Sequence, residues 1–191
     1  MHEFYSLEKL TQCPWVNLFR VQHNHKSQTP RTWMMCSRKQ RPIEEASQAD
    51  AVVVVPMINT ASGCRLVVTK EFRVPIWDYE YGFPAGLIDE GESVEATIAR
   101  ELKEETGLDL VKINHISMPV YSSAGLTDES CVMAMVEASG EVSNRYQEPT
   151  EDIEAVLMDA HQIGNLLASR KKVAAKAWGL FYHYHQLGRI E

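Results

Sequence analysis

The apolar residues of this chain fall mainly in short runs that are typical of β-strands. The valine run at residues 51–59 predicts a buried strand, and residues 64–70 follow a short turn as its hairpin partner. Further extended segments are predicted at residues 15–21, 32–37, 76–83, 112–121, 131–137 and 153–158. Residues 161–168 and 173–187 have the spacing of helices. Strands on both sides of one strong central helix, followed by closing helices, predict an α+β fold in which helices flank a mixed sheet.

The central helix is the strongest single element in the sequence. Ser93 is a suitable N-cap, and Gly107 suits the left-handed residue that commonly ends a helix. Between these two residues lie about three and a half helical turns. Val94, Ile98 and Leu102 fall on one side of the helix and form an apolar stripe suited to packing on a sheet.

Three glutamates of this helix occupy unusual positions. Relative to Ile98, Glu105 lies about 20° away around the helix and therefore falls inside the apolar stripe. Glu101 and Glu104 follow within an arc of about 100°, so that the three carboxylates repel one another. A divalent cation would offset this repulsion, and carboxylate oxygens suit Mg²⁺ or Mn²⁺. The alternative is a solvated helix rich in Glu and Lys, but such a helix would not place a carboxylate on its apolar stripe.

Composition and charge narrow the class of protein. The 191 residues carry a net charge of −7, which argues against a general nucleic-acid partner. The longest apolar run, at residues 51–58, is too short to span a membrane, and the opening residues do not have the pattern of a signal peptide. The four cysteines lack the spacing of metal ligands. We therefore expect a cytoplasmic protein with reduced thiols, no nucleic-acid partner and no membrane association.

The N-terminal part reads as a separate piece. The extended segments 15–21 and 32–37, joined by polar residues, predict a β-hairpin. An isolated two-stranded unit is only marginally stable, so this hairpin must pack on the main domain or on a second subunit. We predict an N-terminal strand extension at residues 1–45 that forms a homodimer, and a main domain at residues 46–191.

Nine residues around the central helix match the pattern G-x5-E-x7-R-E-U-x-E-E-x-G-U, in which U is apolar. They are Gly86, Glu92, Arg100, Glu101, Leu102, Glu104, Glu105, Gly107 and Leu108. This pattern is the Nudix box, and the chain resembles the Nudix family at every fixed position. The resemblance implies an α/β/α sandwich and an enzyme that hydrolyses nucleoside diphosphates linked to another group, by metal-assisted attack of water on phosphorus.

Shorter parallels extend the resemblance to the ADP-ribose pyrophosphatase branch of that family. They lie at residues 15–18, 31–33, 37–38, 51–56, 70–73, 84–89 and 123–129. Members of this branch are usually dimers whose N-terminal strands reach across to the partner. The resemblance therefore implies a homodimer that uses Mg²⁺, with Mn²⁺ as a possible substitute, to split ADP-ribose or a related nucleoside diphosphate sugar into two monophosphates.

The same resemblance implies roles for individual residues. Glu101 and Glu105 would bind the metal, with Glu104 as a shared third carboxylate and the carbonyl of Ala85 as a further ligand. Arg100 precedes Glu104 by four residues and can orient its carboxylate. Glu92 would complete the metal shell or hold Arg100. The general base would come from this helix or from Glu129, for which a solvated loop acid is the alternative.

Four further residues are implied to contact the substrate. Arg38 and Arg73 would face its phosphates, because a guanidinium forms bidentate charge-assisted hydrogen bonds with them. For both arginines the alternative is a surface salt bridge. Trp15 and Trp33 would stack on the adenine, and the alternative is that they pack the hairpin.

Three positions depart from the branch. Gly82 replaces a common Glu, Met34 replaces another, and Ala124 stands where a Ser-Pro-Gly loop has proline. All three touch the substrate pocket and none touches the metal helix. Two alternatives therefore stand beside ADP-ribose hydrolysis: a Nudix hydrolase of another specificity, such as one for dinucleoside polyphosphates, and a non-catalytic nucleotide sensor. The intact box argues against the sensor.

Overall fold

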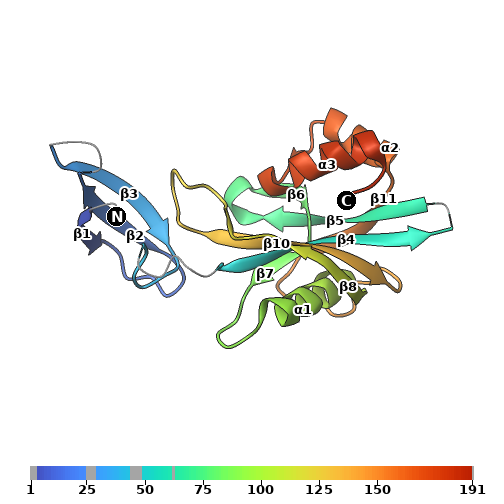
Figure 1. The fold of residues 1–191 in the computed structure, drawn as a ribbon, viewed down its shortest axis with the longest axis horizontal. Coiled ribbons are helices and arrows are strands. Elements are labelled where there is room, and N and C mark those ends of the chain that lie inside the picture. Colours follow the sequence, from blue (N-terminus) through green and yellow to red (C-terminus); the bar gives the residue numbers. More distant parts are fainter. Residues whose placement is uncertain (1–3, 25–28, 44–48, 62, 191) are drawn as a thin grey trace. The chain divides into compact units, whose positions relative to one another are not determined.

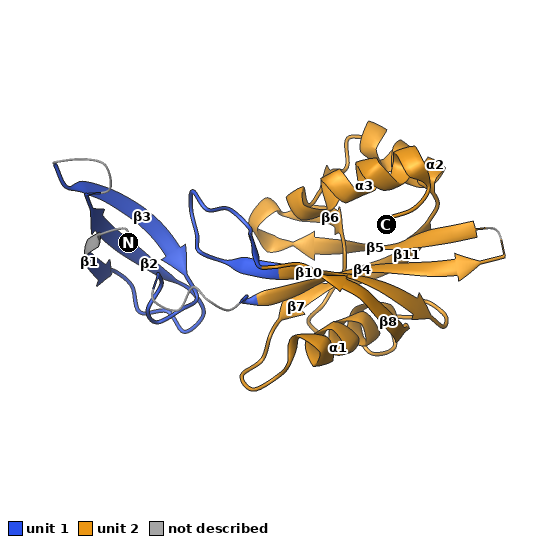
Figure 2. Cartoon of the chain, in the orientation of Figure 1, with its two compact units in different colours: residues 1–50, 119–131 blue, residues 51–118, 132–191 orange. Residues whose placement is uncertain are grey.

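The structure is a computed structural model that describes residues 4–24, 29–43, 49–61 and 63–190, without the side chains of residues 4 and 5. The chain divides into two compact units (Figure 2). The first unit comprises residues 1–50 and 119–131, and the second comprises residues 51–118 and 132–191. The predicted boundary between residues 45 and 46 lies outside the described residues.

The first unit contains a three-stranded antiparallel sheet. Its strands, in spatial order, are β1 (Phe4–Lys9), β2 (Asn17–His23) and β3 (Arg31–Ser37). The predicted hairpin is present as β2 and β3, but the sequence analysis missed β1, which pairs with β2 along its whole length. The hairpin is therefore not an isolated pair of strands.

A small apolar cluster covers one side of this sheet. Phe19, Val21 and Met35 are buried, and Leu7 from β1 packs against them. Buried and exposed residues alternate along β2, as expected for a strand with one solvated face. Leu7 is the member of this cluster that comes from outside the hairpin, and whether the chain is a dimer stays a prediction.

The first unit also contains the loop that precedes strand β10 (Ser130–Ser139). The two-residue strand β9 (Val120–Tyr121) pairs with the beginning of β10. Within the connecting loop, the Leu126 carbonyl accepts a hydrogen bond of 2.9 Å from the backbone N–H of Cys36 on β3. This bond ties the loop to the three-stranded sheet.

The second unit is built on a mixed sheet. Its other strands are β4 (Ala51–Thr60), β5 (Gly63–Arg73), β6 (Asp78–Gly82), β7 (Ala85–Leu87), β8 (Asp109–Ile116), β11 (Ile153–Met158) and β12 (Lys172–Val173). The main spatial order is β12-β6-β5-β4-β10-β8, with β11 paired to β5 and β7 paired to β4. The sheet is mixed because β12 runs parallel to β6 whereas β5 and β6 are antiparallel.

Helices cover both faces of this sheet. Helix α1 (Val94–Thr106) lies on one face, and α2 (Ala160–Ala168) and α3 (Ala175–Leu187) lie on the other (Figure 1). A short 3-10 helix, η1 (Val74–Ile76), joins β5 to β6. The predicted α/β/α sandwich with a mixed sheet is thus confirmed. No helix in the described part of the chain is both long and apolar enough to cross a lipid bilayer.

Two predicted boundaries were wrong. The segment 112–121 forms two strands instead of one, because Pro119 lacks the N–H that a continuous ladder requires. The last helix begins at Ala175 instead of residue 173, because Lys172 and Val173 pair with β6 as a short strand.

Candidate active site

Capping residues fix the position of α1. The hydroxyl of Ser93 accepts a hydrogen bond of 3.2 Å from the backbone N–H of Ala96. Gly107 has φ of 76° and donates its N–H to the carbonyl of Lys103, which closes the last turn. Both predicted caps are confirmed, and they hold the box glutamates in a defined register.

The helix buries two of its three predicted carboxylates. Ile98 and Leu102 are fully buried, as the apolar stripe predicts. Glu101 is 6% exposed and Glu105 is 3% exposed, whereas Glu104 is half-buried. Burying a carboxylate is costly unless it is paired, hydrogen-bonded or bound to a metal. The partners of Glu101 and Glu105 therefore indicate what this helix is built to hold.

Arg100 is the central partner of these acids. Its guanidinium donates to both oxygens of Glu92, at 3.1 and 2.9 Å, and to the carbonyl of Leu87 at 3.1 Å. The same side chain donates to Glu101 Oε1 at 2.7 Å and to Glu104 Oε2 at 3.1 Å. Arg100 therefore aligns three carboxylates at once, and Glu92 holds Arg100, which was one of its two predicted roles. These bonds from Arg100, together with one from Thr97, lower the pKa of Glu92 to about 2.

Glu105 is only partly satisfied. Its Oε1 accepts a long hydrogen bond of 3.4 Å from the backbone N–H of Ala85. Its Oε2 is buried and has no hydrogen-bond partner among the described residues. Burial raises the pKa of Glu105 well above its ordinary value, and the charges of Glu71 and Glu101 raise it further. An unsatisfied buried carboxylate oxygen in an acidic environment is a natural ligand position for a cation.

The acidic cluster also contains Glu71 and Glu151, which were not predicted from the sequence. Burial raises the pKa of Glu71 above its ordinary value, and the ion pair of 2.6 Å with Arg73 opposes that rise. Glu151 contributes to the raised pKa values of both Glu101 and Glu105. Strand alternation could have identified Glu71 from the sequence. Residues two apart on β5 share a face, and Arg73 was already a candidate.

Gly86 provides a second sign of a tight site. A Cβ atom on Gly86 would lie 1.7 Å from Glu101 Oε1 and 2.1 Å from Glu101 Cδ. No side chain fits at this point, so β7 brings its backbone directly against the carboxylate. The box glycine is therefore required for a close approach and not for a special backbone angle.

The residues present fit a hard divalent cation. Three features support this fit. Glu105 Oε2 has no partner among the described residues, Gly86 lets the backbone approach Glu101, and all the donor atoms are oxygens. Among the described residues, no three His, Cys, Asp or Glu side chains converge as a ready-made metal site. Arg100 takes oxygens of Glu101 and Glu104 instead, so a cation would compete with Arg100 for these two carboxylates.

The remaining candidates on the first unit form a separate group. Arg38 Nε lies 3.2 Å from Glu129 Oε2, and the Ser122 hydroxyl donates to Glu129 Oε1 at 2.9 Å. Trp15 is 75% exposed and Trp33 is 51% exposed, so neither belongs to the apolar cluster of the hairpin.

Trp33 lines a cavity of about 250 Å³ within the first unit. The side chains of Met35, Ile43 and Tyr121 also line this cavity, and Trp15 is not among its lining residues. The structure thus brings Arg38 and Glu129 together in the first unit, and brings Arg100, Glu101, Glu104, Glu105 and the backbone of Ala85 together in the second. Arg73 belongs to the second group through Glu71 and also lies 3.8 Å from Glu80.

Comparison with known proteins identifies the family. The family described as "NUDIX domain" matches residues 47–179, which is most of the chain. The chain belongs to the Nudix family. This assignment confirms the resemblance predicted from the box and the prediction that the chain is a Nudix pyrophosphohydrolase.

Individual relatives and a solved structure agree with this family. The chain is 27% identical over 163 residues to "Putative nudix hydrolase 2" of Caenorhabditis elegans, covering 83% of this chain and 72% of that protein. It is 36% identical over 107 residues to "ADP-sugar pyrophosphatase" of Mus musculus, covering 56% of this chain and 48% of that protein. A crystal structure of an ADP compounds hydrolase superposes with a TM-score of 0.73 at 20% identity, covering 99% of this chain and 97% of the other. At that identity, the structural likeness supports the fold.

Proposed function

We propose that this Nudix hydrolase splits the pyrophosphate bond of a nucleoside diphosphate derivative into two monophosphates. ADP-ribose or a related nucleoside diphosphate sugar is the first candidate, because the mouse relative is an ADP-sugar pyrophosphatase. The observation that carries the proposal is the buried carboxylate pair Glu101 and Glu105, on a helix with a complete Nudix box, in which Glu105 Oε2 has no hydrogen-bond partner among the described residues. Burying these carboxylates costs free energy, and a bound cation would offset that cost.

The chemistry explains why such acids are needed. The anionic oxygens of a pyrophosphate repel nucleophiles, and a bound Mg²⁺, for which Mn²⁺ is a possible substitute, neutralises that charge and makes a bound water more acidic. In this proposal Glu101, Glu105, the shared Glu104 and the carbonyl of Ala85 hold the metal. Arg100 positions the carboxylates through its bonds to Glu101 and Glu104.

The substrate contacts complete the proposal. Arg38 and Arg73 bind the phosphates, and each has an arginine's bidentate geometry for that task. In the structure each is paired with an acid, Arg38 with Glu129 and Arg73 with Glu71, so each must leave its partner or bind with its remaining N–H groups. The proposed general base is Glu129 or a glutamate of α1, and in the structure Glu129 accepts a hydrogen bond from Arg38.

The predicted homodimer is also part of this proposal. Trp15 and Trp33 are large apolar side chains that stay exposed in one chain, which is consistent with a role at an adenine or at a second subunit. Light scattering at micromolar concentration measures the oligomeric state directly, and a monomer would contradict this part.

The direct test is hydrolysis of ADP-ribose followed by chromatography. We expect release of AMP and ribose 5-phosphate with Mg²⁺ and no release with excess EDTA. A panel of nucleoside diphosphate sugars and dinucleoside polyphosphates run in parallel defines the substrate class. No hydrolysis of any compound in this panel, by a folded protein with Mg²⁺ or Mn²⁺, would overturn the proposal.

A Nudix hydrolase of another specificity is the second candidate. Gly82 and Met34 stand where relatives of the ADP-ribose branch commonly carry glutamate. The pocket therefore lacks two carboxylates that could form hydrogen bonds with the substrate. Turnover of a dinucleoside polyphosphate at higher kcat/KM than ADP-ribose would favour this candidate.

A further inference from the structure

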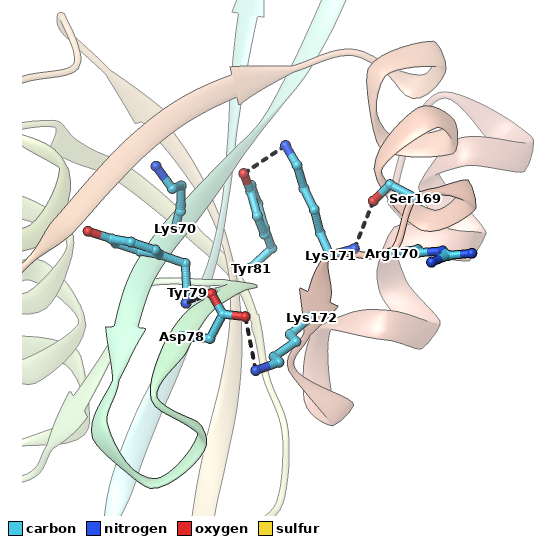
Figure 3. A pocket seen from close by; sticks show the side chains of 8 residues that line it. All are labelled: Lys70, Asp78, Tyr79, Tyr81, Ser169, Arg170, Lys171 and Lys172. Carbon is cyan, nitrogen blue, oxygen red and sulfur yellow. Dashed lines mark hydrogen bonds and ion pairs between the residues drawn. The ribbon is translucent and has the colours of Figure 1, made fainter.

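A second cavity lies in the second unit, between β5, β6 and the chain that joins α2 to β12. Its volume is about 480 Å³, which is within the range of small-molecule sites. Its lining consists of basic, aromatic and small polar residues (Figure 3). They are Lys70, Asp78, Tyr79, Tyr81, Ser169, Arg170, Lys171 and Lys172.

Two residues that line this cavity, Lys70 and Tyr81, point to the opposite face of the sheet from the acids of α1. Lys70 lines the cavity, whereas its neighbour Glu71 contributes to the acidic cluster around Glu105. On β6, Tyr81 lines the cavity, whereas its neighbour Glu80 lies beside Arg73, the partner of Glu71. Successive residues of a strand point to opposite faces, so Lys70 and Tyr81 point away from the acidic cluster, whereas Asp78 shares the face of Glu80 at the start of β6.

The charge of the cavity is opposite to that of the whole chain. Its lining has four cations and one carboxylate, a local charge of +3, in a protein whose net charge is −7. Lys172 lies 3.0 Å from Asp78, and Lys70 lies 2.9 Å from Glu154. These two lysines are therefore neutralised in part.

Lys171 is different because no carboxylate in the described part of the chain pairs with it. Its Nζ donates to the Tyr81 hydroxyl at 3.0 Å and lies 4.9 Å from the centre of the Tyr81 ring. An ammonium has three N–H donors, so this contact leaves donors for a ligand. The backbone N–H of Lys171 donates to the Ser169 hydroxyl at 3.1 Å, which fixes the segment that carries it.

The other cations of the lining point in different directions. Figure 3 shows Lys171 reaching to the Tyr81 hydroxyl, and Arg170 directed away from Tyr81. Tyr79 and Tyr81 supply aromatic walls, and Lys70 lies 4.5 Å from the centre of the Tyr79 ring. A concave surface with one sign of charge focuses the electrostatic potential and attracts the opposite charge.

We propose that this cavity is an anion site for a small soluble molecule that carries a chain of two or more phosphoryl groups. Phosphate oxygens accept charge-assisted hydrogen bonds from ammonium and guanidinium groups. A chain of phosphoryl groups carries several anionic oxygens along its length, which suits a lining with four cations that point in different directions. The site needs no metal, because the cations are supplied by the protein.

Calorimetric titration with inorganic tripolyphosphate in excess EDTA tests this proposal. The chelator removes the contribution of the α1 site, whose acids repel a polyanion when no metal is present. We expect saturable binding of one equivalent, weakened at least about tenfold by Lys171→Glu, which corresponds to about 1.4 kcal/mol. Lys171→Gln keeps most of the aliphatic stem and should weaken binding in the same direction.

Lys112→Glu is the matched control. Lys112 is exposed on β8, at the opposite edge of the sheet from β12, and the substitution changes the net charge by the same amount. We expect this variant to change the affinity less than about twofold, because exposed charges at that distance are screened by salt.

Three results would overturn the proposal. The first is no saturable binding below about 1 mM tripolyphosphate, an affinity equivalent to about 4 kcal/mol. The second is equal weakening by Lys112→Glu and Lys171→Glu, which would indicate attraction to net charge. The third is binding that appears only with Mg²⁺ and is unchanged in Lys171→Gln, which would assign the ligand to the α1 site.

Discussion

Glu105 is the residue on which the proposed chemistry depends most. It is buried, one of its oxygens has no partner among the described residues, and it repels its acidic neighbours. Glu105→Gln keeps the size of the side chain and removes its charge. We expect turnover to fall at least about a hundredfold, the scale of losing one electrostatic group that acts on the transition state.

Initial rates of nucleoside diphosphate hydrolysis at saturating Mg²⁺ measure this effect. Glu95→Gln is the matched control, because Glu95 is exposed in the first turn of the same helix. Activity of Glu105→Gln within about threefold of the parent would remove Glu105 from the metal shell.

The same residue predicts how stability depends on pH without metal. Burial raises the pKa of Glu105 above its ordinary value of 4.5, so the folded state binds its proton more tightly than the unfolded state does. The stabilisation is present below pH 4.5 and is lost as pH rises from there toward the raised pKa. Urea unfolding in EDTA at a series of pH values measures this loss.

Substitution identifies the source of that pH dependence. Glu105→Gln should be less sensitive to pH above 4.5 and should gain stability relative to the parent at neutral pH. Glu92 behaves in the opposite sense, since its pKa is lowered to about 2 and its stabilising effect is lost only as pH falls toward that value. Parallel pH profiles for Glu105→Gln and the parent would contradict the assignment.

At the level of the element, β7 and α1 together fix the position of Glu101. The backbone of β7 approaches Glu101 so closely that a Cβ on Gly86 would overlap the carboxylate. Gly86→Ala must therefore displace Glu101 or β7, and we expect a loss of activity of about a hundredfold or more, the scale of displacing a group by about 1 Å. Steady-state kinetics with a Mg²⁺ titration should also show a weaker apparent affinity for the metal.

Gly179 provides the control for this glycine. It lies in α3, and a Cβ there would meet no atom within 4 Å. Gly179→Ala should leave activity unchanged and raise stability by about 0.5–1 kcal/mol, since alanine favours a helix over glycine. Full activity in Gly86→Ala would show that the close approach to Glu101 is unimportant.

Elements with a strong local signal were predictable, and elements formed by pairing were not. The caps Ser93 and Gly107 are local, and α1 therefore has the predicted position. The strands β1, β7 and β12 were missed because each is held by a partner strand, with β7 paired to the beginning of β4. Short or weakly alternating strands have no periodicity of their own to detect.

The site residues were likewise predictable only where a local pattern in the sequence carries them. The helical wheel predicted that Glu105 lies on the buried stripe, because spacing converts directly into position, but it did not predict the burial of Glu101. It did not predict Glu71 or Glu151, which join the cluster from a strand and a loop. It also did not predict that Arg100 would bond to Glu92, Glu101 and Glu104 together, since that arrangement depends on side-chain conformations.

At the scale of the whole molecule, the proposed residues are divided between two compact units. The metal carboxylates belong to the second unit, and Arg38, Glu129, Trp15 and Trp33 belong to the first. In the proposed function, the carboxylates of the second unit hold the metal and the two tryptophans of the first unit contact the base. Substitutions in the first unit should therefore affect KM more than kcat.

Trp33→Ala tests this division. If Trp33 stacks on the adenine, losing its ring removes about 1–3 kcal/mol of stacking, so KM for ADP-ribose should rise about tenfold or more. The rise should be absent for ribose 5-diphosphate, which has no base to stack. Trp178→Ala is the matched control, because Trp178 on α3 has the same exposed fraction as Trp33, 51%, and lies in the second unit.

The base-free compound decides between stacking and packing. If Trp33 only packs the hairpin, Trp33→Ala should lower the melting temperature, and KM should rise by the same factor for ADP-ribose, its guanine counterpart and ribose 5-diphosphate. Met34 follows Trp33 directly, and its thioether sulfur is a much weaker acceptor for the adenine amino group than a glutamate carboxylate. We therefore expect the parent to show similar KM values for the adenine and guanine compounds, because a flat ring stacks on either base. A strong preference for adenine would show that another polar group reads the base edge and would contradict this interpretation of the pocket.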